Sequence, residues 1–202
     1  MIPKFVLPLL CALMLAPAAD SAYAAAGDPA VAQVQTLDAA LLKSMQAGPS
    51  VSLTERCRNL QPVIEQVFAM PLMTHLAVGA DWPNFTPEQQ KALIAAFTRF
   101  TAANYAYNFR TFGGEKFTVD DNVVSRGEEK VVRTQIVPPH DTPTNLLYRM
   151  REVNGAWKIL DVYSDGVSEL TLRRSDFAAA LAAGGAPALT DHLNKASDGL
   201  LK

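Results

Sequence analysis

The sequence has few of the residues that usually build reactive sites. It contains three histidines and two cysteines in 202 residues, and Cys11 lies in an apolar stretch at the N-terminus. Outside that stretch, Cys57 is the only cysteine, so it has no second thiol with which to form an internal disulfide or a thiolate metal site. We expect Cys57 to be a small buried apolar residue, with a reactive thiol as the alternative.

Sequence motifs for catalysis are also missing. His75, His140 and His192 are far apart, and none stands at metal-ligand spacing from a carboxylate or another histidine. No H-E-x-x-H, G-x-S-x-G, phosphate-loop or G-x-G-x-x-G pattern occurs. Asp161 lies in an apolar segment, either as a general base with a raised pKa or as a structural acceptor for a neighbouring strand, arginine or loop amide. We therefore predict no catalytic residue, no metal site and no cofactor.

Long hydrophobic runs and strong charge are equally scarce. The net charge of −2 with no basic tract argues against nucleic-acid binding. The single long apolar run, residues 5–16, is shorter than the roughly 20 residues that cross a bilayer. Lys4 precedes this run, and Ala22 and Ala24 follow it at the spacing of a cleavage site. We predict a signal peptide of residues 1–24, with cleavage after Ala26 as the alternative, and a single exported domain of residues 25–202.

Apolar residues at helical spacing predict helices in the first half of this domain. One covers residues 28–47, and another follows the capping pattern Ser52-Leu53-Thr54-Glu55 towards residue 60, where Pro62 kinks it or starts a new helix. Residues 70–84 are rich in proline and glycine and read as a loop. The strongest helix covers residues 87–112, because Thr86, Pro87 and Gln89 form a helix start and Gly113-Gly114 a stop.

Alternating apolar and polar residues then predict four strands, at residues 117–119, 132–136, 146–150 and 157–163, with Asn154-Gly155 as a tight hairpin turn. This alternation places Asp161 on the same face as Trp157. Short helices are predicted at residues 177–183 and from Pro187 onwards, while residues 170–174 are ambiguous between strand and helix. The pattern indicates an α+β fold, with a curved four-stranded antiparallel sheet covered by helices that enclose an apolar pocket.

Three segments of the chain resemble the MlaC family of periplasmic phospholipid-binding proteins, also called the toluene-tolerance auxiliary family. They are Trp82 with residues 85–106, the run Trp157-Lys158-Ile159-Leu160-Asp161-Val162 with Gly166-Val167-Ser168, and Arg174-Ser175-Asp176-Phe177 with Gly184-Gly185. Within the family, residues 135–139, 147–151 and 173–177 are most similar to the hopanoid-associated HpnM branch. Gly166-Val167-Ser168 instead has the form of the broader family.

The resemblance implies a soluble monomeric shuttle in the periplasm. Its cargo would be a phospholipid or a hopanoid, held by the acyl or apolar part in a pocket between sheet and helices. Its partners would be an inner-membrane lipid transporter complex and an outer-membrane complex. We expect the pocket lining to come from inward-facing residues of the sheet, the long helix and the last loop, although core packing is the alternative for each: Phe97, Phe100, Tyr105, Val132, Ile136, Leu146, Tyr148, Met150, Val162 and Val167.

Two other functions fit the same residues. One is a ligand-free adaptor of a membrane transport complex, and the other is a small-molecule enzyme that uses Asp161 as its base. The sequence leaves open the cargo, the direction of transport and the identity of the partners.

Overall fold

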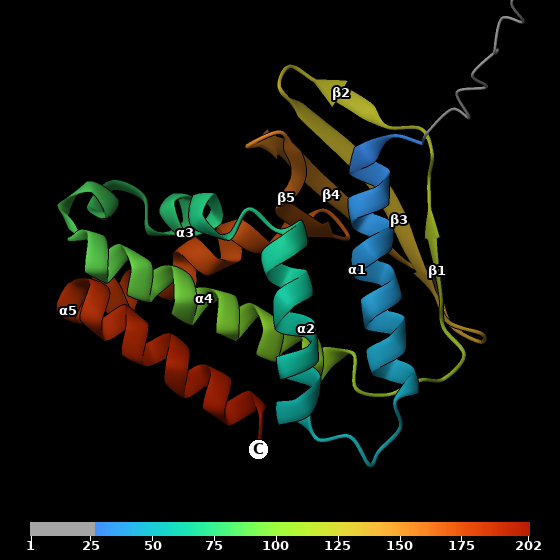
Figure 1. The fold of residues 1–202 in the computed structure, drawn as a ribbon, viewed down its shortest axis with the longest axis horizontal. Coiled ribbons are helices and arrows are strands. Elements are labelled where there is room, and N and C mark those ends of the chain that lie inside the picture. The colour runs from blue at the N-terminus through green and yellow to red at the C-terminus, as the bar shows by residue number, and fades with distance from the viewer. Residues whose placement is uncertain (1–26) are drawn as a thin grey trace, which may run out of the picture.

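The computed structural model describes residues 27–202, so the predicted signal peptide lies outside the described residues. An antiparallel sheet carries helices on one of its faces (Figure 1). The helices are α1 (Pro29–Gln46), α2 (Leu53–Val67), α3 (Met70–Val78), the 3-10 segment η1 (Gly79–Asn84), α4 (Pro87–Asn108) and α5 (Glu169–Leu200). The predicted α+β class is confirmed.

The sheet has six strands, so the prediction of four is wrong. They are β1 (Lys116–Val119), β2 (Val124–Arg126), β3 (Glu129–Val137), β4 (Thr144–Val153), β5 (Ala156–Ser164) and β6 (Val167–Ser168). The order is β1-β3-β4-β5-β6, and β2 pairs with the first part of β3, while β1 pairs with its last part. The two missed strands have three residues and two residues, which is too short for an alternation of side chains to be visible.

Burial alternates along β3 and β4, where helices cover one face only, whereas Ile159 to Val162 of β5 are buried on both faces. Val132 and Tyr148, which pair across β3 and β4, are at most 1% exposed, whereas the neighbouring Arg133 is exposed. Helix α1 packs over this inner face against β1, β3 and β5 (Figure 1). The outer face carries Arg133, Arg149 and Arg151, as expected for the solvated side of an antiparallel sheet.

A β-bulge in β5 changes the face to which Asp161 belongs. Arg149 pairs with Asp161, but the next residue, Met150, pairs with Ile159, so Leu160 is an extra residue in the ladder. Because Trp157 pairs with Glu152, three positions beyond Arg149, Trp157 and Asp161 lie on opposite faces. The prediction that they share a face is therefore wrong, since it assumed an unbroken alternation.

Helix α2 continues through Pro62 to Val67, so Pro62 lies inside this helix and does not start a new one. Residues 70–84, predicted as a loop, form α3 and η1. Pro71 occupies the first turn of α3, where a missing amide hydrogen costs nothing, and Gly79 ends the helix with a φ of 73°. Proline and glycine thus mark the two ends of a helix in this segment.

The predicted capping box of α4 is present, because Thr86 and Gln89 each accept a hydrogen bond from the other's backbone amide. The helix ends at Asn108, four residues before the predicted end.

Helix α5 begins at Glu169, with Ser168 as its cap, and settles the ambiguous residues 170–174 as helix. It is interrupted at Gly184-Gly185, where Gly185 has a φ of 62°, and continues with Pro187 in the first turn beyond.

A buried arginine holds the connection between α1 and α2. Arg56 is 3% exposed, and its guanidinium donates to the carbonyl oxygens of Ser44, Gly48 and Val51. These carbonyls lie in the last turn of α1 and in the loop after it, and those of Ser44 and Gly48 also accept hydrogen bonds from the backbone amides of Ala47 and Val51. The sequence gives no sign of this role, because the arginine lies on a helix face that otherwise reads as ordinary.

We expect Arg56→Met to lower the free energy of unfolding by about 3 kcal/mol, because the carbonyl oxygens of Ser44, Gly48 and Val51 each lose a hydrogen bond from a charged donor. Urea denaturation measures this change. The matched control is Arg58→Met on the exposed side of the same helix. Equal stabilities of the two variants would show that the Arg56 hydrogen bonds contribute little.

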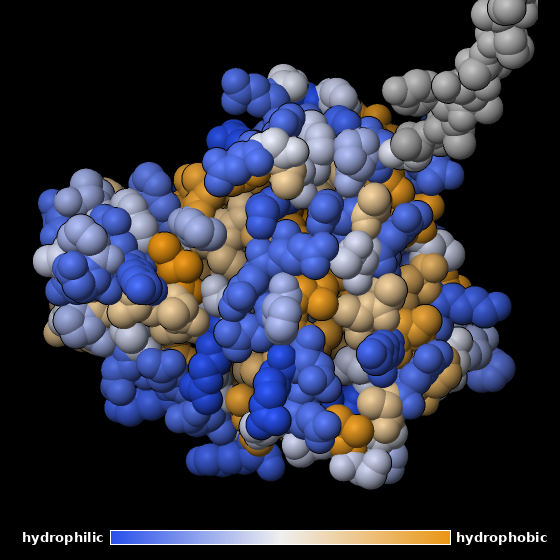
Figure 2. Space-filling model, viewed as in Figure 1, coloured by the Kyte–Doolittle hydropathy of each residue, from blue (hydrophilic) through white to orange (hydrophobic). Residues whose placement is uncertain are grey.

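The face of the molecule seen in Figure 2 is largely hydrophilic, with apolar side chains in scattered places between polar ones. Within residues 27–202, none of the helices combines the length and apolar character needed to cross a bilayer. Most of the large apolar side chains lie in one core that joins the helices to the sheet.

Candidate functional site

A cavity of about 300 Å³ lies between α4, the start of α5 and the inner face of the sheet. Phe68, which follows α2, and Met73 of α3 complete its wall. The lining residues are Phe68, Met73, Phe97, Phe100, Thr101, Asn104, Tyr105, Asn108, Phe109, Ile136, Thr144, Leu146, Tyr148, Val162, Ser164, Glu169, Leu170 and Arg173.

The apolar part of the wall is largely aromatic. Phe68 contacts Tyr105 with ring centroids 5.9 Å apart, and Tyr105 stacks on Phe109 at 5.7 Å. Phe97 meets Phe177 of α5 edge to face at 5.2 Å, which joins the two helices beside the cavity. Contacts of this kind add to the burial of apolar area and fix the position of the rings. The cavity therefore has an ordered apolar wall.

Seven of the ten predicted residues line this cavity: Phe97, Phe100, Tyr105, Ile136, Leu146, Tyr148 and Val162. Val132 and Met150 are fully buried in the core instead. Val167 is 53% exposed in β6, where it pairs with the lining residue Ser164. The structure thus brings together residues of α4, β3, β4 and β5, while their role in binding a ligand stays a prediction.

The residues that sequence reasoning missed fall into three groups. Thr101, Asn108 and Phe109 continue the α4 face that carries Phe97 and Asn104, so helical spacing could have found them. Phe68 and Met73 lie on either side of the start of α3, and only Met73 belongs to the segment that was predicted to be a loop. The third group comes from the ends of strands and the start of α5: Thr144, Ser164, Glu169, Leu170 and Arg173.

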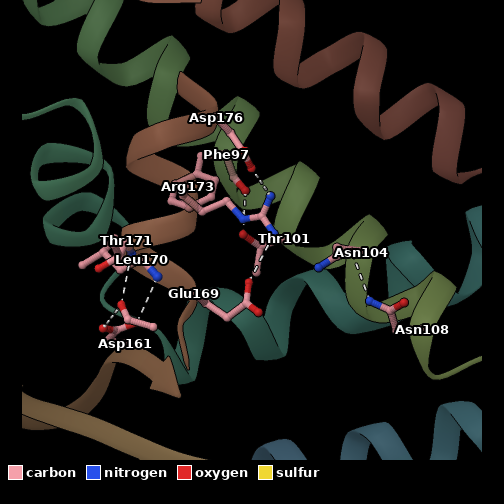
Figure 3. Close-up of polar contacts among 11 residues, drawn as sticks. Phe97, Thr101, Asn104, Asn108, Asp161, Glu169, Leu170, Thr171, Arg173 and Asp176 are labelled. Atoms are coloured by element: carbon pink, nitrogen blue, oxygen red, sulfur yellow. Dashed lines mark hydrogen bonds and ion pairs between the residues drawn. The ribbon is translucent and has the colours of Figure 1, made fainter. Parts of the chain in front are cut away.

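Polar and charged side chains gather at one part of the lining, where α4 and the first turns of α5 approach one another (Figure 3). Asn108 donates to Asn104 at 3.0 Å on α4. On α5, Arg173 lies between two carboxylates and donates to Glu169 at 3.2 Å and to Asp176 at 2.8 Å. Its guanidinium carbon is 5.3 Å from the centroid of the Phe100 ring. The cavity is therefore amphipathic.

Asp161 does not line the cavity. Ser168 donates its hydroxyl to one carboxylate oxygen at 2.7 Å, and the Leu170 amide donates to the other at 3.0 Å (Figure 3). The carboxylate is 2% exposed and connects β5 to the first turn of α5. Of the two roles considered for Asp161, a general base or a structural acceptor of hydrogen bonds, this geometry matches the second.

A second buried carboxylate, Asp38, lies on the inner side of α1. It is 5% exposed, and neither oxygen has a hydrogen-bond partner. Burial raises its pKa from 3.8 to about 7. Burial also raises the pKa of the Tyr105 hydroxyl, and the Glu169 and Asp38 carboxylates raise it further. The Asp38 carboxylate also contributes to the raised pKa of the Tyr148 hydroxyl, for which burial is the largest cause.

Cys57 and His75, two other candidate reactive residues, are packed against neighbouring parts of the fold. Cys57 is buried, as predicted, and burial raises the pKa of its thiol, which keeps it protonated and unreactive. His75 stacks on Trp82 with ring centroids 5.5 Å apart. In the part of the chain that the structure describes, no group of three or more histidine, cysteine or acidic side chains is arranged to hold a metal ion.

A solved structure shares this fold. It is described as the phospholipid-binding protein from Ralstonia solanacearum in complex with a phospholipid, and it superposes with a TM-score of 0.73. The alignment covers 86% of this chain and 99% of that chain, at 22% sequence identity. Independently, the model of the family described as MlaC protein matches residues 35–195, which include every residue that lines the cavity. The chain belongs to the MlaC family.

Proposed function

We propose that this protein is a lipid carrier that binds the apolar part of a phospholipid or a hopanoid in the cavity between α4, α5 and the sheet. The observation that carries the proposal is the lining itself, which is aromatic and aliphatic along most of its wall and polar at one part. That division matches a lipid, whose tails avoid water while its headgroup stays hydrated. Membership of the MlaC family and the phospholipid complex of the Ralstonia solanacearum protein support the same ligand class.

A carrier of this kind has a clear physical task. Each methylene group that leaves water gains about 0.8 kcal/mol, so a lipid with about 30 of them faces a barrier on the order of 20 kcal/mol in open water. An apolar cavity removes most of this barrier by replacing the contacts that the lipid had in the membrane. Release then requires a partner that changes the relative stability of the empty and loaded forms.

The size of the cavity implies that its walls separate on loading. About 300 Å³ lies at the low end of the range of roughly 300–1,000 Å³ for small-ligand sites, whereas a two-tailed lipid is a large ligand. The aromatic residues between α4, α5 and the sheet fill the neighbouring space and would move aside. We expect loading to proceed by movement of α4 and α5 relative to the sheet, because these elements form most of the wall.

The proposal includes the setting in which the carrier works. Residues 1–24 would direct export and be removed, leaving a monomer in the periplasm. It would exchange lipid with a transporter complex of the inner membrane and with a partner complex of the outer membrane. A non-enzymatic role agrees with Asp161, because both of its oxygens accept hydrogen bonds from the start of α5 and neither faces the cavity.

Native mass spectrometry of freshly purified protein tests the proposal. The expected result is a bound mass of several hundred daltons that organic solvent removes and that extraction identifies as phospholipid or hopanoid. A protein that is free of ligand and takes up no labelled lipid from vesicles would contradict the carrier and favour the adaptor.

A further inference from the structure

The charged part of the cavity lining consists of two residues on one helix. Among the described residues that line the cavity, Glu169 and Arg173 carry the full charges, and they are one helical turn apart on α5. The guanidinium Nη2 is 3.2 Å from a Glu169 oxygen, and Nη1 is 2.8 Å from a carboxylate oxygen of Asp176. The three side chains form a group with one positive and two negative charges.

The guanidinium is held at the boundary between the apolar wall and water. The Arg173 side chain is 22% exposed, compared with 40% for Glu169 and 52% for Asp176. The ring of Phe100 lies beneath it, with 5.3 Å between the guanidinium carbon and the ring centroid. Contacts with two carboxylates and one aromatic ring orient its donors, which suits the paired hydrogen bonds that arginine makes to phosphate.

Two backbone amides in the first turn of α5 already have acceptors within the protein. The Leu170 amide already donates to Asp161, and the Thr171 amide donates to the Ser168 hydroxyl. The start of this helix is therefore occupied by its own caps, although helix starts often bind anions. Recognition of a headgroup would depend on the side chains of Arg173 and Glu169.

We propose that this end of the cavity recognises a zwitterionic phospholipid headgroup, an inference that rests on the proposed lipid-carrier function. Arg173 donates to the phosphodiester, and Glu169 accepts from the ammonium group. The net charge of Glu169, Arg173 and Asp176 is −1, which explains the preference for a zwitterionic headgroup over an anionic one. An anionic lipid would make the net charge at this place more negative, at −2, whereas a headgroup with one phosphate and one ammonium leaves it at −1.

The test uses vesicles with equal amounts of phosphatidylethanolamine and phosphatidylglycerol that have identical acyl chains. Purified protein is incubated with them and separated from them, and its bound lipids are quantified by mass spectrometry. We expect the wild type to be enriched in phosphatidylethanolamine. We expect Glu169→Gln to lower the ethanolamine-to-glycerol ratio about fivefold, which corresponds to the loss of one partly exposed ion pair.

Two further variants make the result specific. Arg173→Gln removes the phosphate donors, so the amount of both bound lipids should fall while the ratio does not decrease. Asp191→Asn is the matched control, because Asp191 forms an exposed pair with Lys195, at the same spacing on α5 but outside the cavity lining. Thermal melting of every variant shows whether the fold is retained.

The outcomes separate this inference from the carrier function. Wild-type protein that takes up both lipids without enrichment would overturn the headgroup proposal and leave the carrier function intact. An unchanged ratio in folded Glu169→Gln would have the same meaning. A wild type that takes up neither lipid would overturn the headgroup proposal and also contradict the carriage of phospholipids.

Discussion

Glutamate in place of Ile136 is expected to reduce the lipid bound by the purified protein at least tenfold. Ile136 is half-buried in β3, and its side chain lines the cavity opposite the aromatic wall of α4. A carboxylate there must either remain charged beside acyl chains or take up a proton, and both alternatives cost free energy. A loss of about 1.4 kcal/mol already corresponds to a tenfold change in affinity. Quantitative lipid extraction measures the effect.

The next residue in the strand provides the matched control. Val137 is also half-buried, but it lies on the outer face of the sheet and is absent from the cavity lining. Val137→Glu places the same charge in the same strand, so its lipid content should stay close to that of the wild type. If both variants fold and bind equal amounts of lipid, the cavity assigned here is not where the lipid binds.

The stability of the protein is expected to fall between pH 4 and pH 7 because of Asp38. Its pKa rises from 3.8 to about 7 in the folded protein, so the folded state keeps a proton that the unfolded chain releases. The favourable contribution is therefore complete below pH 4 and is lost as the pH approaches 7. A rise of the pKa from 3.8 to about 7 corresponds to about 4 kcal/mol in the free energy of unfolding.

The variant Asp38→Asn isolates this contribution from that of other groups. It keeps the size and the polar character of the protonated acid but cannot ionise. The wild type and the variant should have similar free energies of unfolding at pH 4, and the variant should be more stable by about 4 kcal/mol at pH 8. Asp121→Asn, at an exposed position, is the control. Parallel stability profiles for wild type and Asp38→Asn would show that the carboxylate ionises without penalty.

Local patterns predicted several elements well because their causes lie within a few residues. The capping box at Thr86 and the turn at Asn154-Gly155 depend on neighbouring backbone groups, and both are present. The predicted elements were wrong where one residue type is common in two kinds of local structure, as proline and glycine are in loops and at helix ends. Pro71 lies in the first turn of α3 and Gly79 ends it, although the same two residue types are also typical of a loop. The bulge at Leu160 had no local mark, and it moved Asp161 to the other face of the sheet.

The cavity could be predicted only in part for a related reason. The aromatic face of α4 and the alternation of β3 and β4 identify side chains that point inward, and most of the predicted lining is found there. Periodicity does not say whether an inward side chain meets another side chain or an open space. Val132 and Met150 are inward but fully packed, while Tyr148 and Val162 border the cavity.

The α+β class and the inward faces of the main elements could be predicted from the sequence because they follow from spacing over short distances, and the family from the resemblance of three segments. The tertiary structure was needed to find that Phe68 and Met73 complete the cavity, that Arg56 and Asp38 are buried, and that Asp161 holds the start of α5. Each of these features depends on contacts between segments that are distant along the chain. A local pattern can specify the direction of a side chain, but its neighbours are fixed only when the helices pack on the sheet.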